Sequence, residues 1–184
     1  FVDGDPRNTI RVADERVLPK ANYFGGDLAG VLRVLEADLL AMRIDSHVAR
    51  LDPAALTDAR TLRALADRHP GPALDALAHL ALAQIYPLQE RLDEAAEHAA
   101  AALAAARRSR DPRLIALARL REAGARFRHS AAAAAPAAAD AAERFERLGE
   151  RSLQAQAVRL LAAARLAQAE TPEHVALAQR AVDL

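Results

Sequence analysis

Apolar residues recur at steps of three and four along most of this 184-residue chain, and this spacing constrains the fold more than any other feature. In the stretch FGGDLAGVLRVLEADLLAMR, for example, it joins Leu28, Val31, Leu35 and Leu39. Steps of three and four place side chains on one face of an α-helix. No segment alternates polar and apolar residues for long enough to indicate a β-strand. The spacing therefore predicts an all-α protein.

Proline, glycine and capping residues divide this pattern into separate helices. Asp52 before Pro53, Asp111 before Pro112 and Thr171 before Pro172 are helix-start signals. Gly149 fits the residue that follows a helix. We expect a short helix over 9–24, bent or broken at Pro19, a helix from 28, and another that begins at 53 and ends before His69-Pro70-Gly71-Pro72. Further helices are expected at about 72–87, 91–108, 112–129, 136–148, 151–169 and 172–184.

Two segments allow more than one interpretation. Residues 44–51 either extend the preceding helix or form a turn of their own. In the alanine-rich stretch 130–142, either a helix starts at Pro136 or the helical register slips there.

Composition limits both the core and the class of partner. Hydrophobic residues make up 52 % of the chain but aromatic residues only 3 %, with no Trp, so alanine and leucine must form the core. The 25 basic and 25 acidic residues cancel, which argues against direct contact with nucleic acid or an anionic membrane. Cysteine is absent, which excludes disulfides and thiolate chemistry. No apolar run is long enough to span a bilayer, so we expect a cytoplasmic protein.

The helices are arranged in pairs that repeat. The segments AARRSRDP at 105–112 and RFERLGER at 144–151 lie about 39 residues apart, and periods of 20–50 residues indicate solenoid repeats. We expect one repeat array over 1–184. The chain begins with Phe1 and ends inside a helical pattern at Leu184, which suggests a fragment of a longer protein. The approximate units are 8–51, 53–71 (partial), 72–111, 112–150 and 151–184.

These pairs resemble tetratricopeptide (TPR) repeats, in which small residues lie where two helices cross. Gly26-Asp27-Leu28 resembles the turn of such a unit, although Asp38 departs from the small residue usual at its place. Residues 72–107 match better, and residues 151–184 resemble the family again. In 72–107, His79 replaces the Trp of the family and Glu90 replaces its turn glycine. The matching positions in that unit are Leu82, Ala83, Tyr86, Ala95, Ala99, Ala102 and Leu103.

The resemblance implies a fold and a function. The fold is a right-handed superhelix of antiparallel helix pairs, a TPR-like α-solenoid. The function is a protein–protein interaction module that binds a peptide or a partner helix on its concave face. Similar arrays occur in large bacterial transcription regulators, so a regulatory, sensor or oligomerisation region of such a protein is the alternative. No helix-turn-helix is evident in these residues.

Sites for chemistry are not indicated. Gly25-Gly26 lacks the further glycines, the lysine and the preceding strand of a phosphate loop, so it is interpreted as a turn between helices. Glu94 and His98 are four residues apart and could share a metal, but the simpler interpretation is a solvated pair on one helix face. His79 is expected to pack between helices. We therefore predict no catalytic residue, no metal and no cofactor, and we do not expect an enzyme.

Partner contacts are predicted on the polar side of the first helices of the pairs. Arginines cluster at 119, 121, 126 and 128, and their guanidinium groups suit the carboxylates of an acidic peptide. The predicted partner-binding residues are Arg119, Arg126, Gln154 and Arg159. A homodimer through the terminal repeat is a further possibility, because an apolar stripe runs through Val175, Leu177, Ala178 and Val182.

Overall fold

Residues 28–169 are described by the structure, a computed structural model, and they are almost entirely helical. None of these residues lies in a strand, so the predicted all-α class is confirmed. The helices are α2 (Leu28–Ala49), α3 (Ala54–Arg68), α4 (Pro72–Ile85), α5 (Leu92–Ser109), α6 (Pro112–His129), α7 (Ala131–Leu148) and α8 (Arg151–Ala169), with a short 3₁₀ helix η1 (Tyr86–Gln89) after α4. The expected helices at 9–24 and 172–184, the turn at Gly25-Gly26 and the apolar stripe of the terminal repeat lie outside the described residues.

Local signals account for most of the helix boundaries. The Asp111 side chain accepts hydrogen bonds from the backbone N–H groups of Arg113 and Leu114, at 2.8 and 3.2 Å, directly before α6. Asp52 accepts one from the Ala54 N–H at 2.9 Å, where α3 begins. Gly149 has a φ of +71°, which is the left-handed conformation expected after α7. These predicted starts and stops are confirmed.

The two ambiguous segments are settled by the structure. Residues 44–49 continue α2, and the chain then turns at Arg50 and Leu51. The predicted start of a helix at Pro136 is wrong, because α7 begins at Ala131 and Pro136 lies inside it. Ser130 explains the earlier start: its side-chain oxygen accepts the Ala133 N–H at 3.3 Å and so caps the helix.

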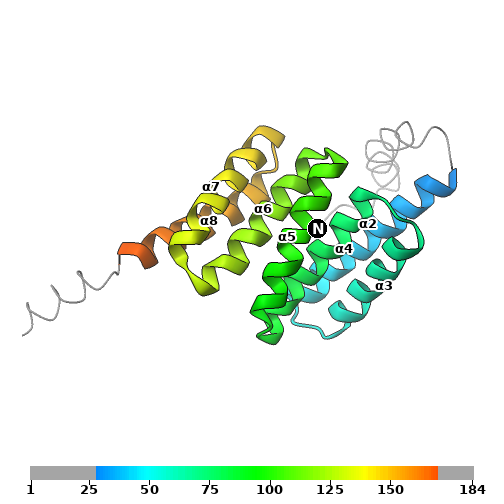
Figure 1. Ribbon diagram of the computed structural model, residues 1–184, viewed down its shortest axis with the longest axis horizontal. Coiled ribbons are helices and arrows are strands. Elements are labelled where there is room, and N and C mark those ends of the chain that lie inside the picture. The colour runs from blue at the N-terminus through cyan, green and yellow to red at the C-terminus, as the bar shows by residue number, and fades with distance from the viewer. Residues whose placement is uncertain (1–27, 170–184) are drawn as a thin grey trace, which may run out of the picture.

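Each helix packs against the next one in the chain. Helices α2, α4, α6 and α8 also pack against one another in order, so that they form a continuous row. In Figure 1, α2 and α3 lie at one end of the molecule and α7 and α8 at the other. The pairs α4–α5 and α6–α7 occupy the ranges 72–111 and 112–150, while α3, in the range 53–71, packs against both α2 and α4.

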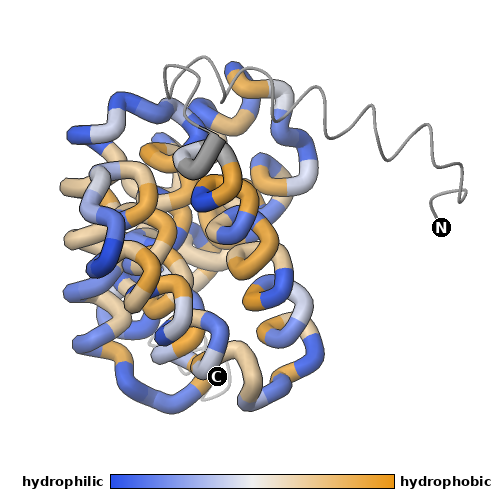
Figure 2. Tube along the Cα trace, turned by 90° about the vertical axis from the view of Figure 1, so that its right-hand side faces the viewer, coloured by the Kyte–Doolittle hydropathy of each residue, from blue (hydrophilic) through white to orange (hydrophobic). Residues whose placement is uncertain are grey.

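The core lies between these helices as a succession of small clusters. One cluster joins α2, α3 and α4, the next joins α4, α5 and α6, and others join α6, α7 and α8. Hydrophobic and hydrophilic residues alternate around the helical turns of the chain trace in Figure 2, as the three-to-four spacing requires. The core therefore extends from α2 to α8, and each of these α-helices contributes buried residues to it.

Candidate functional site

A chain of polar side chains crosses the row formed by α2, α4 and α6. Gln84 on α4 donates from Nε2 to Asp45 Oδ1 on α2, at 3.0 Å. Arg121 on α6 donates from Nη2 to Gln84 Oε1, at 2.5 Å. The three residues are separated by 39 and 37 positions in the sequence, so only the packing of successive helices brings them together. We refer to Asp45, Gln84 and Arg121 as the polar row.

Arg121 is the chemically distinctive member of the polar row. Burial lowers the pKa of Arg121, and the Asp45 carboxylate opposes that shift. A guanidinium nevertheless stays protonated in proteins, so the group carries a positive charge at neutral pH. Its hydrogen-bond partner within residues 28–169 is the neutral amide of Gln84. A partly desolvated guanidinium with a neutral partner keeps donors for an anion, and carboxylates match its geometry.

The predicted contact residues Arg119 and Arg126 already have carboxylate partners within the chain. Arg119 Nη1 lies 2.7 Å from Glu122 Oε2, and Arg126 Nη2 lies 2.7 Å from Glu122 Oε1. The hydrogen bond to Glu122 raises the pKa of Arg119 above its ordinary value. Glu122 therefore neutralises much of the charge on this side of α6. A partner would have to compete with Glu122 for both guanidinium groups.

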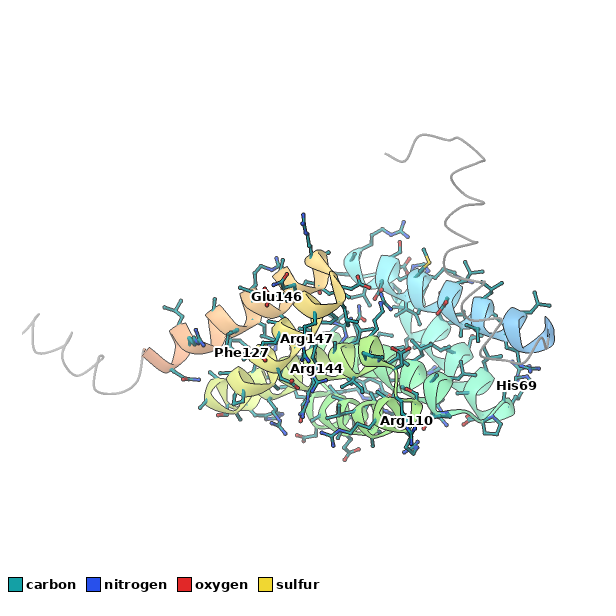
Figure 3. All side chains as sticks on the ribbon, turned by 90° about the horizontal axis from the view of Figure 1, so that it is seen from above. His69, Arg110, Phe127, Arg144, Glu146 and Arg147 are labelled. Atoms are coloured by element: carbon teal, nitrogen blue, oxygen red, sulfur yellow. The ribbon has the colours of Figure 1, made fainter. Side chains whose placement is uncertain are left out.

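Arg119 also connects α6 to α7. Its Nε lies 2.9 Å from Asp140 Oδ2, an ion pair without the alignment of a hydrogen bond. Asp140 Oδ1 accepts from Arg144 Nε at 2.8 Å. Arg144 lies on α7 with Arg147, and both are labelled in Figure 3. The ion pairs around Asp140 tie two neighbouring helices together, which is a structural role.

Gln154 and Arg159 lie on α8, which packs against both α6 and α7. Gln154 is half-buried in the first turn, and its backbone N–H donates to the Glu150 carbonyl at 2.9 Å. Arg159 is exposed. No hydrogen bond or ion pair within the described part of the chain joins these two side chains to Arg119 or Arg126. The four predicted contact residues therefore stay a prediction and do not form one cluster here.

Arg121 belongs to the arginine cluster that the sequence shows, but it is not among the partner-binding residues predicted from the sequence. Spacing does separate it from Arg119 and Arg126, which lie three and four residues from Glu122, whereas Arg121 has no carboxylate at either distance. Its actual partner carries no such signal, because no motif links Gln84 and Asp45 to position 121. Only the order in which the helices stack reveals the polar row.

A second polar cluster lies on α4 and α5. His79 Nδ1 and His98 Nδ1 are 2.7 Å apart, so one imidazole donates to the other, and their ring centroids are 5.0 Å apart. The Tyr86 ring lies 5.2 Å from that of His98, and the Arg91 guanidinium lies 4.1 Å above the Tyr86 ring. Burial lowers the pKa of both histidines. The expectation that His79 packs between helices is confirmed.

The possible metal pair of Glu94 and His98 is not arranged as a site. Glu94 forms an ion pair with Arg91, through Arg91 Nη2 at 2.7 Å and a second contact from Nε. His98 instead faces His79. Within residues 28–169 no group of three or more histidine or carboxylate side chains is placed to hold a metal ion.

An open cleft of about 550 Å³ lies where the α3–α4 turn meets the end of α5. Asp75 lies between two arginines in its wall, 2.7 Å from Arg63 and 3.0 Å from Arg108. Arg63 also pairs with Asp67 at 2.5 Å. The positive charges of the two guanidinium groups and the negative charges of the two carboxylates thus cancel, so the cleft favours neither an anionic nor a cationic ligand. Its other walls are Ala66, Pro70, Gly71 and Pro72.

No family model, curated protein or solved structure matches this chain. None of the helices in the described range is long and apolar enough to cross a membrane. The function of this chain is therefore inferred from the geometry of the described residues, above all from the polar row.

Proposed function

We propose that this protein is an interaction module that binds an acidic peptide, or a partner helix rich in carboxylates, across α2, α4 and α6. The observation that carries the proposal is Arg121, a partly desolvated guanidinium whose hydrogen-bond partner in residues 28–169 is an amide rather than a carboxylate. A carboxylate of the partner would give this guanidinium a charge-assisted hydrogen bond, in addition to the Coulombic attraction of Asp45. Hydrogen bonds to charged groups contribute about 1.5–3 kcal/mol each, enough to orient a peptide on this surface.

The architecture that we propose for this module is a TPR-like, right-handed superhelix of helix pairs. Two packing features support it: each described helix contacts its neighbour in the chain, and α2, α4, α6 and α8 form a row of their own. In a solenoid such a row lines one extended face, which suits a partner that contacts several helices at once. In this proposal the protein is not an enzyme.

The first prediction concerns the role of Arg121 in binding. The probe is a fluorescein-labelled decapeptide rich in Glu, compared with the same peptide in which Gln replaces every Glu. We expect wild type to bind the Glu peptide more tightly, because a Glu carboxylate forms a charge-assisted hydrogen bond with the guanidinium and a Gln amide does not. Arg121→Gln should weaken binding roughly tenfold or more, since a charge-assisted hydrogen bond is lost. Fluorescence anisotropy at fixed ionic strength measures both affinities.

Arg128→Gln is the matched control, because Arg128 is an exposed arginine on the same helix. It removes the same charge from α6, and we expect a change of less than about threefold from loss of an exposed charge. Circular dichroism confirms that both variants keep their helicity. Equal affinity of wild type and Arg121→Gln would overturn the assignment of the site. Equal binding of the Glu and Gln peptides would overturn an acidic partner.

A further inference from the structure

Gly124 is an unexpected residue for the middle of a helix. Within residues 28–169, α6 is the only helix with a glycine in its interior, since Gly30 lies in the first turn of α2 and Gly71 and Gly149 lie outside the helices. Glycine weakens a helix, and one reason for its presence is the close approach of a ligand to the backbone. A Cβ atom at position 124 would meet no other heavy atom within 4 Å. Packing within the chain therefore does not require this glycine.

Gly124 lies on the side of α6 that carries Arg121. Leu117, Arg121 and Gly124 follow one another at steps of four and three, which places them on one side of the helix. The hydrogen bond from Arg121 to Gln84 shows that this side of α6 borders α4. Gly124 is half-buried, and it is one helical turn from Arg121. The open space at Gly124 is therefore close to the guanidinium that we propose to bind a carboxylate.

Two leucines add apolar surface beside this polar site. Leu117 on α6 and Leu77 on α4 are both half-buried, and both pack against the core cluster that joins α4, α5 and α6. Part of each side chain therefore stays accessible at the surface. Leu117 lies one turn before Arg121, on the other side of it from Gly124. A partner that reaches Arg121 would thus meet apolar as well as cationic surface.

We propose that the acidic partner seats an aliphatic side chain over Gly124, next to the carboxylate that Arg121 binds. This inference rests on the proposed function and narrows the partner to a segment in which acidic and aliphatic residues are neighbours. Because Gly124 has no side chain, the aliphatic group can approach the helix backbone closely and lose contact with water, which favours binding. A larger residue at position 124 would occupy the same space.

Two labelled decapeptides of equal charge test the aliphatic contact. In one peptide Glu alternates with Leu, and in the other Glu alternates with Ser. We expect wild type to bind the Glu–Leu peptide about tenfold more tightly than the Glu–Ser peptide, because only leucine removes apolar surface from water. Fluorescence anisotropy at fixed ionic strength measures both affinities.

Variants at Gly124 locate that contact. Gly124→Leu should remove the preference for the Glu–Leu peptide, because its side chain fills the space. Gly124→Ala adds one methyl group and should reduce the preference only in part, so the loss follows the size of the side chain. Urea denaturation checks that both variants stay folded. If Gly124→Leu unfolds, Gly124→Ala decides, since the added Cβ atom meets no neighbour within 4 Å.

Ala104→Leu is the matched control, because it adds a leucine at an exposed alanine of α5. It should leave the preference unchanged. The inference is overturned if wild type binds both peptides equally, if the preference survives in both Gly124 variants, or if Ala104→Leu removes it as well. A third peptide, in which Gln alternates with Leu, separates this failure from failure of the proposed function. If it binds as tightly as the Glu–Leu peptide, the acidic partner and this inference both fail; if it binds more weakly, only the aliphatic contact is in question.

Discussion

At the scale of single residues, alanine sets how closely the helices approach. Many of the buried positions are alanine, and the largest fully buried side chains, Phe145, Ile44, Leu62 and Leu65, are few. Small side chains at crossings let helix axes come to the short end of the usual 8–10 Å. A core of this kind needs few aromatic residues, as the composition indicates. Alanines that are fully buried include Ala59, Ala76, Ala99, Ala102, Ala116, Ala123 and Ala138.

Backbone conformation at turns depends on position as well as residue type. The resemblance to TPR repeats places a glycine where this chain has Glu90, and Glu90 adopts the left-handed conformation that glycine favours, with a φ of +60°. Arg110 does the same after α5, with a φ of +57°. Neither turn therefore requires a glycine, although the left-handed conformation costs a non-glycine residue about 1–2 kcal/mol.

Gly124 is expected to be a destabilising residue within α6. A Cβ atom added at this position would meet no other heavy atom within 4 Å. Glycine in a helix interior costs roughly 0.5–1 kcal/mol relative to alanine, because the unfolded chain is more flexible. We expect Gly124→Ala to raise the free energy of unfolding by about that amount, measured by urea denaturation. A loss of stability would mean that the open space at Gly124 has a role in packing.

The pair of His79 and His98 predicts a dependence of stability on pH. Burial lowers the pKa of both imidazoles in the folded protein, and the neighbouring cations Arg63, Arg108 and Arg91 add to this effect, while Asp75, Glu97 and Glu94 oppose it. The unfolded chain then binds more protons below the ordinary histidine pKa of about 6.5. Stability contributed by the neutral pair is present above that pH and is lost as the pH falls below it.

Urea unfolding at pH 7.5 and pH 5.5 measures this effect. We expect the free energy of unfolding of wild type to be lower at pH 5.5. The double variant His79→Gln/His98→Gln should lose less stability over the same interval, because both titrating groups are gone. An identical loss in wild type and double variant would show that other groups cause the acid sensitivity.

At the scale of elements, the start of α7 depends on two opposing effects, the stabilising cap of Ser130 and the destabilising presence of Pro136. Pro136 has no N–H to donate to the Ala132 carbonyl, so a helix that starts at Ala131 loses a hydrogen bond there. The Ser130 cap, together with the burial of Ala134 against the rest of the molecule, outweighs this loss. The spacing of apolar residues alone does not predict where such a helix begins, because the stabilising effect of the cap and the destabilising effect of the proline are similar in size.

Pro136→Ala should therefore stabilise α7. Pro136 is exposed, so the substitution removes no buried contact, and it restores the hydrogen bond to the Ala132 carbonyl. Given a cost of about 3 kcal/mol for proline in a helix interior, reduced here by closeness to the N-terminus, we expect a gain of about 1–3 kcal/mol. Thermal denaturation followed by circular dichroism measures it. No gain would mean that a bend at Pro136 is needed for α7 to fit against α6.

At the scale of the whole molecule, contacts are local in sequence. Each helix contacts its neighbours in the chain and, for α2, α4, α6 and α8, the next member of that row. In the solenoid that we propose, stability would be close to a sum of neighbouring interfaces, so the helices at its ends would depend on what covers their outer faces. The exposed side chains of Leu32, Leu39 and Met42 on α2 are the clearest instance of this dependence among the described residues.

The sequence by itself determined the all-helical class and most of the helix boundaries. The reason is that both depend on local information: the spacing of apolar residues, a capping side chain such as Asp111, and a glycine such as Gly149 all act within one or two turns. Where local signals compete, as between Ser130 and Pro136, the boundary was predicted wrongly.

Only the tertiary structure decided which charged residues have partners on other helices. Glu122 pairs with Arg119 and Arg126 inside α6, at spacings of three and four that the sequence itself shows, whereas α7 supplies Asp140 to Arg119 and α4 supplies the amide of Gln84 to Arg121. These partners on neighbouring helices lie far away in the sequence, 37 residues in the case of Gln84. Their position follows from how the helices stack, and local spacing carries no record of that stacking.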